Sequence, residues 1–188
     1  MIQVAMEAAK EGGEVLKKYF ETSLQRRFKD DSSIVTEADE ETEKVIIDII
    51  KKTYPDHSFL GEEGGEQDLG SSYTWIIDPL DGTRNFVNGI PIFAISIALV
   101  KDNKHLASVV YNPLTDAMFS AEAGKGSFCN GAQFRVSDHD AKSGMLTIGT
   151  SSSKESKKTA AKLFSNALEY VGAVRYLGSA VLELAYLA

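Results

Sequence analysis

The hydrophobic pattern of the first 55 residues predicts two amphipathic helices. Apolar residues recur at helical spacing from Ile2 to Phe20, although Gly12-Gly13 weakens the middle of this stretch. After a polar and charged segment, Thr36-Glu37-Ala38-Asp39 is typical of a helix start, and a second apolar stripe follows it. Pro55 should end this second helix, because proline cannot continue a helical ladder.

Beyond Pro55 the pattern changes to short apolar, β-branched or aromatic runs, which are typical of strands. These runs lie at residues 58–60, 74–77, 93–100, 106–111 and 117–121. Turn formers such as Asp102-Asn103, Asn112-Pro113 and Asn130-Gly131 stand where one strand would reverse into the next. We expect an antiparallel meander covered by the two helices, which makes residues 1–140 an α+β domain.

From about residue 145 the expected order becomes a strand (145–149), a helix (154–171), a short strand (174–177) and another helix from about Ser179. Ser151-Ser152-Ser153 should be the loop into the first of these helices. Because Ala188 falls inside the apolar stripe of the last helix, we expect residues 141–188 to be the beginning of a C-terminal α/β domain. The expected fold class is therefore α+β with an α/β continuation that is incomplete at the C-terminus.

The composition is that of a globular protein, and it narrows the classes of partner. The 188 residues are 43% hydrophobic and 25% charged, and a net charge of −7 disfavours nucleic acid, which requires a basic face. Cys129 is the only cysteine, so no intrachain disulfide is expected and a reducing cytoplasm suits the chain. The sequence also lacks a basic and apolar leader pattern and any window approaching 18 apolar residues, so we expect neither export nor a membrane span.

Two aspartates close to one strand are the strongest candidates for chemistry. The run 74–77 should deliver Asp78 at the end of a buried strand, and Pro79 should prevent the ladder from continuing. The chain would then turn so that Asp81 comes back beside Asp78. Together with the Leu80 carbonyl between them, these carboxylates offer the hard oxygen ligands that magnesium takes.

The next two residues suit a phosphate. Gly82 lacks a Cβ, so the backbone can approach an anion closely, and the Thr83 hydroxyl and nearby amides can donate to it, particularly if a helix begins there. The spacing fits equally well an ordinary β-turn whose aspartates cap free backbone amides. Both interpretations stay open from these residues alone.

Two further carboxylates have competing interpretations. Glu62, in Gly61-Glu62-Glu63-Gly64-Gly65 directly after a strand, could swing toward a metal from a neighbouring strand. Taken alone, this segment is more typical of a solvated acidic loop, and only the aspartates at another strand end favour a metal ligand. Asp39 stands in a capping pattern with Thr36, but it could also take a proton from a water that attacks phosphorus.

Other chemistries have little support in the sequence. His57, His105 and His139 are scattered without the spacing of metal ligands, so we expect surface or turn histidines. No G-x-x-x-x-G-K-[ST] phosphate loop or complete dinucleotide fingerprint is present.

The segment from Trp75 to Phe86, WIIDPLDGTRNF, resembles the signature of the inositol-monophosphatase-like family of magnesium-dependent phosphatases. Similar blocks follow the family order at residues 34–39, 59–65, 89–99 and 177–188. The resemblance implies a layered αβαβα sandwich of the sugar-phosphatase type. The family has a further W-D-x-A-A-G-like block with another metal-binding aspartate, and this chain stops before it. We therefore expect the front part of such an enzyme, and poor folding and little activity if the polypeptide ended at Ala188.

The resemblance also implies roles for individual residues. The implied magnesium ligands are Glu62, Asp78, the Leu80 carbonyl and Asp81, with Glu63 as a less certain one. The implied phosphate and substrate contacts are Asp81, Gly82, Thr83, Gly178, Ser179 and Ala180. Thr83 and Asp39 would activate the water, and Glu62 would complete the catalytic group.

The expected function is hydrolysis of a small polyol or sugar phosphate by a water activated by two or three Mg²⁺ ions, which Mn²⁺ could replace. Inositol 1-phosphate is the first candidate substrate, because Asn85-Phe86 follows the Asp-Gly-Thr turn as in inositol phosphatases. Fructose 1,6-bisphosphatase activity is close behind, and phosphoadenosine or histidinol phosphates are weaker alternatives. A different class remains open, a noncatalytic family fragment that acts as a binding module. The resemblance further implies a homodimer. From composition and charge we expect a cytoplasmic protein without a nucleic-acid or membrane partner.

Overall fold

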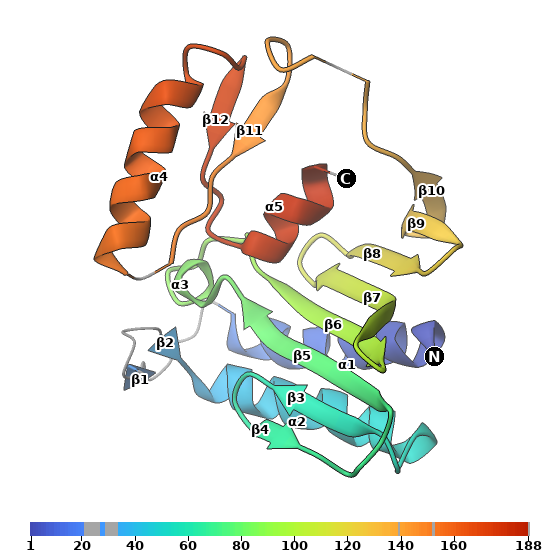
Figure 1. The fold of residues 1–188 in the computed structure, drawn as a ribbon. Helices are drawn as coiled ribbons and strands as arrows, with labels where there is room; N and C mark the ends of the chain where they lie inside the picture. Colours follow the sequence, from blue (N-terminus) through green and yellow to red (C-terminus); the bar gives the residue numbers. More distant parts are fainter. Residues whose placement is uncertain (21–26, 29–33, 139, 152, 188) are drawn as a thin grey trace.

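Two long helices lie against one face of a mixed sheet in the computed structural model, which describes residues 1–20, 27–28, 34–138, 140–151 and 153–187 (Figure 1). They are α1 (Ile2–Tyr19) and α2 (Glu37–Thr53), which pack on each other and on the sheet through their apolar faces. Both predicted helices are confirmed, and α2 ends before Pro55 as expected.

The glycine pair in α1 allows a close approach to the sheet. A Cβ on Gly12 would lie 3.0 Å from Ile95 Cδ1, and one on Gly13 would lie 2.6 Å from Tyr111 Cε1. Both glycines are buried and the helix continues through them. The low helix propensity of glycine is thus accepted where a larger side chain would push α1 away from the sheet.

The main sheet has eight strands in the order β10-β9-β8-β7-β6-β5-β3-β4. Its strands are β3 (Ser58–Gly61), β4 (Gly65–Gln67), β5 (Tyr73–Asp81), β6 (Ala94–Lys101), β7 (Lys104–Asn112), β8 (Ala117–Glu122), β9 (Gly126–Cys129) and β10 (Ala132–Phe134). From β5 to β10 each strand pairs antiparallel with the next, so the predicted meander is confirmed there. The meander does not extend to β3, which pairs parallel with β5 and antiparallel with β4.

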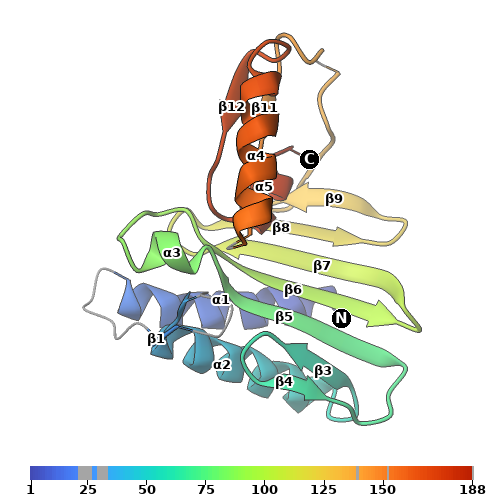
Figure 2. The same ribbon diagram turned by 60° about the vertical axis from the view of Figure 1, so that its left-hand side comes forward.

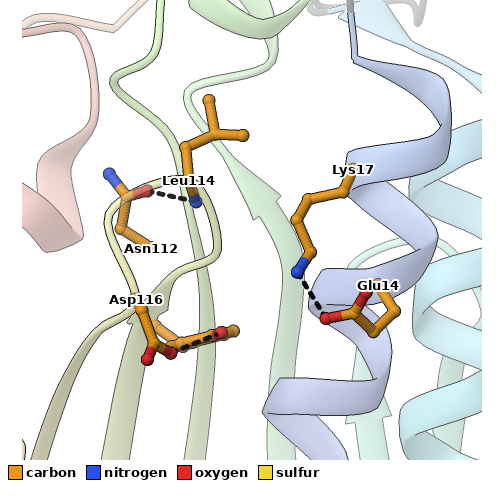
Figure 3. Close-up of polar contacts among 6 residues, drawn as sticks. Glu14, Lys17, Asn112, Leu114 and Asp116 are labelled. Carbon is orange, nitrogen blue, oxygen red and sulfur yellow. Dashed lines mark hydrogen bonds and ion pairs between the residues drawn. The ribbon is translucent and has the colours of Figure 1, made fainter.

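The turns of the meander lie where the turn formers predicted them. Asp102 and Asn103 have φ of 47° and 62°, the left-handed pair of a two-residue hairpin turn that aspartate and asparagine tolerate. At the β7–β8 turn, Asn112 Oδ1 accepts a hydrogen bond of 3.0 Å from Leu114 N (Figure 3). The Asn112 side chain thus forms an Asx turn, in which its oxygen takes the place of a backbone carbonyl, as is common for asparagine.

Strand β5 does not stop at Pro79, so that expectation is wrong. The ladder with β6 pairs Asp78 with Ser96, shifts register, and resumes at Asp81 and Ala94. Proline is tolerated at such a bulge because its missing N–H is not needed there. Asp78 and Asp81 consequently belong to one continuous, irregular strand.

A smaller unit stands on the face of the main sheet opposite α1 and α2 (Figures 1 and 2). It contains a parallel pair, β11 (Met145–Thr147) and β12 (Ala173–Arg175), joined through α4 (Lys154–Ala167). Helix α5 (Ala180–Leu187) follows and contacts β6 and β7. The strand–helix–strand–helix order is confirmed with shorter elements than expected, and Ser153 caps α4 by accepting from Ser156 N at 3.1 Å. The division at residue 140 stays a prediction.

Two details complete the fold. A short antiparallel pair joins β1 (Arg27–Phe28) to β2 (Ile34–Val35). Within the described residues, no helix has the length and apolar character needed to cross a membrane.

The three histidines do not share one environment. His57 lies between the rings of Tyr54 and Tyr73, at centroid distances of 4.8 and 4.7 Å, and its Nδ1 accepts from Trp75 Nε1 at 3.0 Å. It is thus part of an aromatic cluster rather than a simple surface histidine. His105 is exposed, and His139 lies outside the described residues.

Candidate active site

The parallel pairing of β3 and β5 brings two predicted ligands to one place. The register sets Gly61 beside Ile77, and Glu62 N donates to the Ile77 carbonyl at 3.1 Å. Glu62 therefore leaves β3 alongside Asp78 of β5. The predicted convergence of strand ends is present for this pair, although the chain reaches it by parallel pairing.

Burial and like charge both act on Asp78. Burial, then the charge of Glu62, then the charge of Asp81, raise the pKa of the Asp78 carboxyl to about 8, and a side-chain hydrogen bond with Glu62 adds to the shift. A divalent cation would reverse this effect, because it becomes the dominant local charge. The donor set of carboxylates with the buried Leu80 carbonyl is of the hard oxygen type that fits magnesium or manganese.

The carboxylates do not, however, surround a common point. Among the residues that the structure describes, no three His, Cys, Asp or Glu side chains are grouped as a metal cage. Asp78 Oδ1 accepts from Leu80 N at 3.0 Å, and Asp81 Oδ2 accepts from Val181 N at 3.0 Å. Both aspartates thus also serve as caps for backbone amides, the alternative that the sequence left open. The side chains lie close enough for their charges to interact, while their metal-binding role stays a prediction.

Gly82 and Thr83 start a short helix next to these aspartates. Gly82 has a φ of 91° and precedes α3 (Thr83–Phe86), so the expected helix start is present. A Cβ on Gly82 would lie 2.9 Å from the Ile92 carbonyl oxygen, which leaves room for glycine alone. Thr83 Oγ1 donates to the Leu80 carbonyl at 3.1 Å, so Thr83 is tied to a predicted metal ligand.

The loop before α5 meets β5 at Asp81. Ser179 Oγ donates to Asp81 Oδ2 at 2.5 Å, and Ser179 is fully buried. Burial raises the pKa of Asp81, while the bonds from Ser179 and Val181 oppose the rise. The structure thus joins the predicted substrate segment of Gly178, Ser179 and Ala180 to the predicted phosphate segment, although the two are distant in the sequence.

Asp39 is buried and caps the start of α2. Its Oδ2 accepts from Thr36 N at 2.8 Å and from Thr36 Oγ1 at 2.6 Å, and Thr36 Oγ1 accepts from Ala38 N at 3.2 Å. The capping interpretation is therefore confirmed. Burial raises the pKa of Asp39 to about 6, against the bonds from Thr36, which lower it. The hydrogen bonds of Asp39 and Thr83 lead to different partners, and the role of Asp39 as a base stays a prediction.

Three side chains hold the loops of this site in a way that the sequence did not predict, and two of them, Glu43 and Glu183, were not singled out at all. Asn85 Nδ2 donates to the carbonyls of Ile92 at 2.7 Å and Leu177 at 2.8 Å. Glu43 and Glu183, which are 3% and 5% exposed, each accept bonds from two consecutive backbone amides. Their only signal in the sequence is a glutamate inside a helical pattern, which is ordinarily a solvated residue.

Comparison with known proteins places these features in a family. A model described as the inositol monophosphatase family matches residues 1–188. The fructose-1,6-bisphosphatase/inositol-1-monophosphatase of Aquifex aeolicus is 35% identical over 100% of this chain and 72% of its own length. Inositol monophosphatase 2 of Solanum lycopersicum is 37% identical over 97% of the chain and 72% of its length. Nus factor SuhB of Pasteurella multocida is 36% identical over 100% of the chain and 72% of its length.

Solved structures agree with the fold and confirm the expected fold class. The extragenic suppressor protein suhB from Bartonella henselae superposes with a TM-score of 0.93 at 36% identity, covering 98% of this chain and 73% of that one. A Thermotoga maritima IMPase gives 0.89 at 32% identity, covering 97% and 70%. With the whole chain matched, the protein belongs to the inositol monophosphatase family, metal-dependent phosphoric monoester hydrolases that act on small phosphorylated substrates.

Proposed function

We propose that this chain hydrolyses a small polyol or sugar phosphate with Mg²⁺ as the cofactor, and that inositol 1-phosphate is the first substrate to test. The observation that carries the proposal is the register of β3 and β5, which sets Glu62 beside Asp78, with Asp81 three residues further along the same strand. The raised pKa of Asp78 supports a site that requires a cation.

In this proposal the carboxylates of Glu62, Asp78 and Asp81 and the Leu80 carbonyl hold two or three Mg²⁺ ions, for which Mn²⁺ can substitute. Magnesium, when bound, would neutralise the ester's phosphate and lower the pKa of the attacking water. Glu63 is a further candidate ligand.

The remaining roles belong to the chain's own groups. Amides at Gly82 and Thr83 bind the phosphate, and the Thr83 hydroxyl orients the water. Asp39 takes the proton from that water, and a pKa of about 6 leaves it largely ionised at pH 7. Gly178, Ser179 and Ala180 contact the alcohol part of the substrate, which the bond between Ser179 and Asp81 supports.

Several related phosphate esters are candidate substrates. The Aquifex aeolicus relative carries both activities in its name, so fructose 1,6-bisphosphate is the second substrate to test, ahead of phosphoadenosine and histidinol phosphates. Asn85 and Phe86 support inositol 1-phosphate only indirectly, because Asn85 bonds to backbone carbonyls and Phe86 is buried in the core. We further propose a cytoplasmic homodimer.

A noncatalytic binding role is the second candidate. A relative of 36% identity is named as a Nus factor rather than as an enzyme, which favours testing this class. In that case the acidic residues near Asp78 would bind a cation or partner without turnover.

Turnover separates the two candidates. The folded chain is incubated with Mg²⁺ and a panel of polyol, sugar and nucleotide phosphates, and released phosphate is measured with and without a chelator. We expect release from inositol 1-phosphate that needs the metal, and a loss of at least about 100-fold in Asp78→Asn, as for a group that acts in the transition state. Asp102→Asn is the matched control, because it removes one carboxylate at an exposed turn where asparagine is tolerated. Absence of release from every ester by the folded wild type would favour the binding module.

A further inference from the structure

Glu43 is a buried carboxylate on α2 that faces the loop after β3. Its side chain is 3% exposed and lies on the helix face that also buries Ile46 and Ile50. Burying a charged group is unfavourable unless strong hydrogen bonds compensate it. The position of Glu43 therefore requires partners, and the structure supplies them.

Two consecutive backbone amides of the loop donate to this carboxylate. Glu63 N lies 2.9 Å from Oε2 and Gly64 N lies 2.6 Å from Oε1, so each oxygen has its own donor. Hydrogen bonds to an ionised acceptor are stronger than those between neutral groups. Such a fork fixes the direction of both peptide units and hence the path of the loop.

The glycines of the loop are matched to the same carboxylate. A Cβ on Gly61 would lie 2.5 Å from Glu43 Cδ, and a Cβ on Gly64 would lie 2.7 Å from Glu43 Oε1. Neither glycine has a left-handed φ, so conformational freedom does not explain them. Because Gly61 and Gly64 have no side chains, the loop can pack directly on the Glu43 carboxylate. A glycine at these two positions therefore depends on the glutamate at position 43.

The loop held in this way carries Glu62. Glu62 N donates to the Ile77 carbonyl, so the residue is fixed to β5 on one side, while Glu43 holds the two residues that follow it. Glu183 repeats the arrangement at the other loop of the site, where its Oε1 accepts from Leu177 N at 2.8 Å and Gly178 N at 3.2 Å. The loop of Glu62 and the loop before α5 are thus each held by one buried glutamate.

We propose that Glu43 is a positioning residue that sets the affinity of the site for Mg²⁺ by fixing the loop of Glu62, without contacting metal or substrate itself. The inference rests on the proposed metal-binding role of Glu62. Groups that orient metal ligands from behind typically change metal affinity by about 10–100-fold when they are replaced.

The test compares Glu43→Gln with Glu66→Gln in otherwise identical protein. Glutamine keeps the shape but presents an amide N–H to one of the two backbone donors, which breaks the fork. Glu66 is exposed on the neighbouring strand β4, so its replacement removes the same charge without touching the fork. Mg²⁺ affinity is measured by calorimetry, amide hydrogen exchange at Glu63 and Gly64 by NMR, and folding by circular dichroism.

We expect faster exchange at both amides and a Mg²⁺ affinity lower by about 10–100-fold in Glu43→Gln, with less than about 3-fold change in Glu66→Gln. Unchanged affinity in a folded Glu43→Gln whose two amides exchange faster would overturn the proposal. If the wild type binds no Mg²⁺, the proposed metal site itself is wrong, and this inference falls with it. If the wild type binds Mg²⁺ and only the Glu43 result differs from the expectation, the inference alone is wrong.

Gly64→Ala disturbs the contact between Glu43 and the loop by changing the loop instead of the glutamate. It provides a second test if Glu43→Gln does not fold. The new methyl group would displace the Glu43 carboxylate, because it points at Oε1 while the backbone conformation suits alanine. We expect the same loss of affinity, and a combination with Glu43→Gln that is weaker than additive because both changes break one contact. An Mg²⁺ affinity equal to that of the wild type in folded Gly64→Ala would overturn the proposal.

Discussion

Ser179 Oγ donates a hydrogen bond of 2.5 Å to Asp81 Oδ2 across 98 positions of the sequence. The same oxygen accepts from Val181 N at 3.0 Å, so the end of β5 also caps the start of α5. A residue proposed to bind metal and phosphate is therefore joined directly to the loop proposed to bind the alcohol part of the substrate. The bond makes the position of each segment depend on the other.

Replacing Ser179 should show how much this bond stabilises the fold. Ser179→Ala removes a buried donor to a carboxylate, so we expect the free energy of unfolding to fall by about 1.5–3 kcal/mol. Denaturant titration followed by circular dichroism measures the change. Ser108→Ala is the control, because Ser108 is exposed on β7, and a surface change of this kind stays within about 0.5 kcal/mol. Equal losses in the two variants would contradict the expectation.

Asn85 should tolerate aspartate poorly, although the two side chains have almost the same shape. Its Nδ2 donates to two backbone carbonyls, and a carboxylate would place negative charge against both of them. We expect Asn85→Asp to lower the free energy of unfolding at pH 8 by about 3 kcal/mol or more. The loss should shrink at pH 4, where a protonated Asp can donate one hydrogen bond.

The control for this exchange is Asn88→Asp. Asn88 Nδ2 also donates to a carbonyl, that of Arg84 at 2.7 Å, but at an exposed position. Solvent can replace that bond, so the cost should stay below about 1 kcal/mol. Losses of similar size at the two asparagines would show that the two hydrogen bonds of Asn85 stabilise the fold no more than the single exposed bond of Asn88.

Gly82 should be sensitive to alanine for two reasons, and Gly89 separates them. Both glycines have a left-handed φ, 91° and 70°, which costs alanine about 1–2 kcal/mol. Only Gly82 has neighbours where the methyl group would go, whereas nothing lies within 4 Å at Gly89. We expect Gly82→Ala to lose roughly 1–3 kcal/mol more than Gly89→Ala in denaturant titrations, as overpacking does. Equal losses would mean that the backbone conformation alone matters.

Much of the fold could be predicted because its signals are local. The stripe that starts after Thr36 and the turn at Asn130-Gly131 each lie within a few residues, and both are found where expected. The parallel pairing of β3 with β5 could not be predicted in this way, because β4 and its connections intervene. Pairing of this kind depends on packing of the whole sheet rather than on local propensity.

The residues of the candidate site also divide into those that local sequence signals reveal and those that depend on the folded structure. Asp78, Asp81 and Gly82 could be found because they are adjacent in the sequence and of unusual type. Glu43 could not, because in a helix rich in glutamate nothing marks the one that is buried. Pro79 led to a wrong expectation, because the sequence does not reveal that a bulge lets the strand continue past it.

Asp39 should make the stability of the chain depend on pH, and the sign follows from its burial. Burial raises its pKa from 3.8 to about 6, so the folded state favours the protonated form. The stabilisation is fully present below about pH 4 and is lost as the pH rises through 6, since the folded state then binds more protons than the unfolded state. Relative to Asp39→Asn, which cannot ionise, the wild type should lose up to about 3 kcal/mol of unfolding free energy between pH 4 and pH 7. Glu37→Gln, at an exposed position two residues earlier in the first turn of α2, is the control for the loss of one carboxylate there, and a constant difference between wild type and Asp39→Asn would exclude Asp39 as the titrating group.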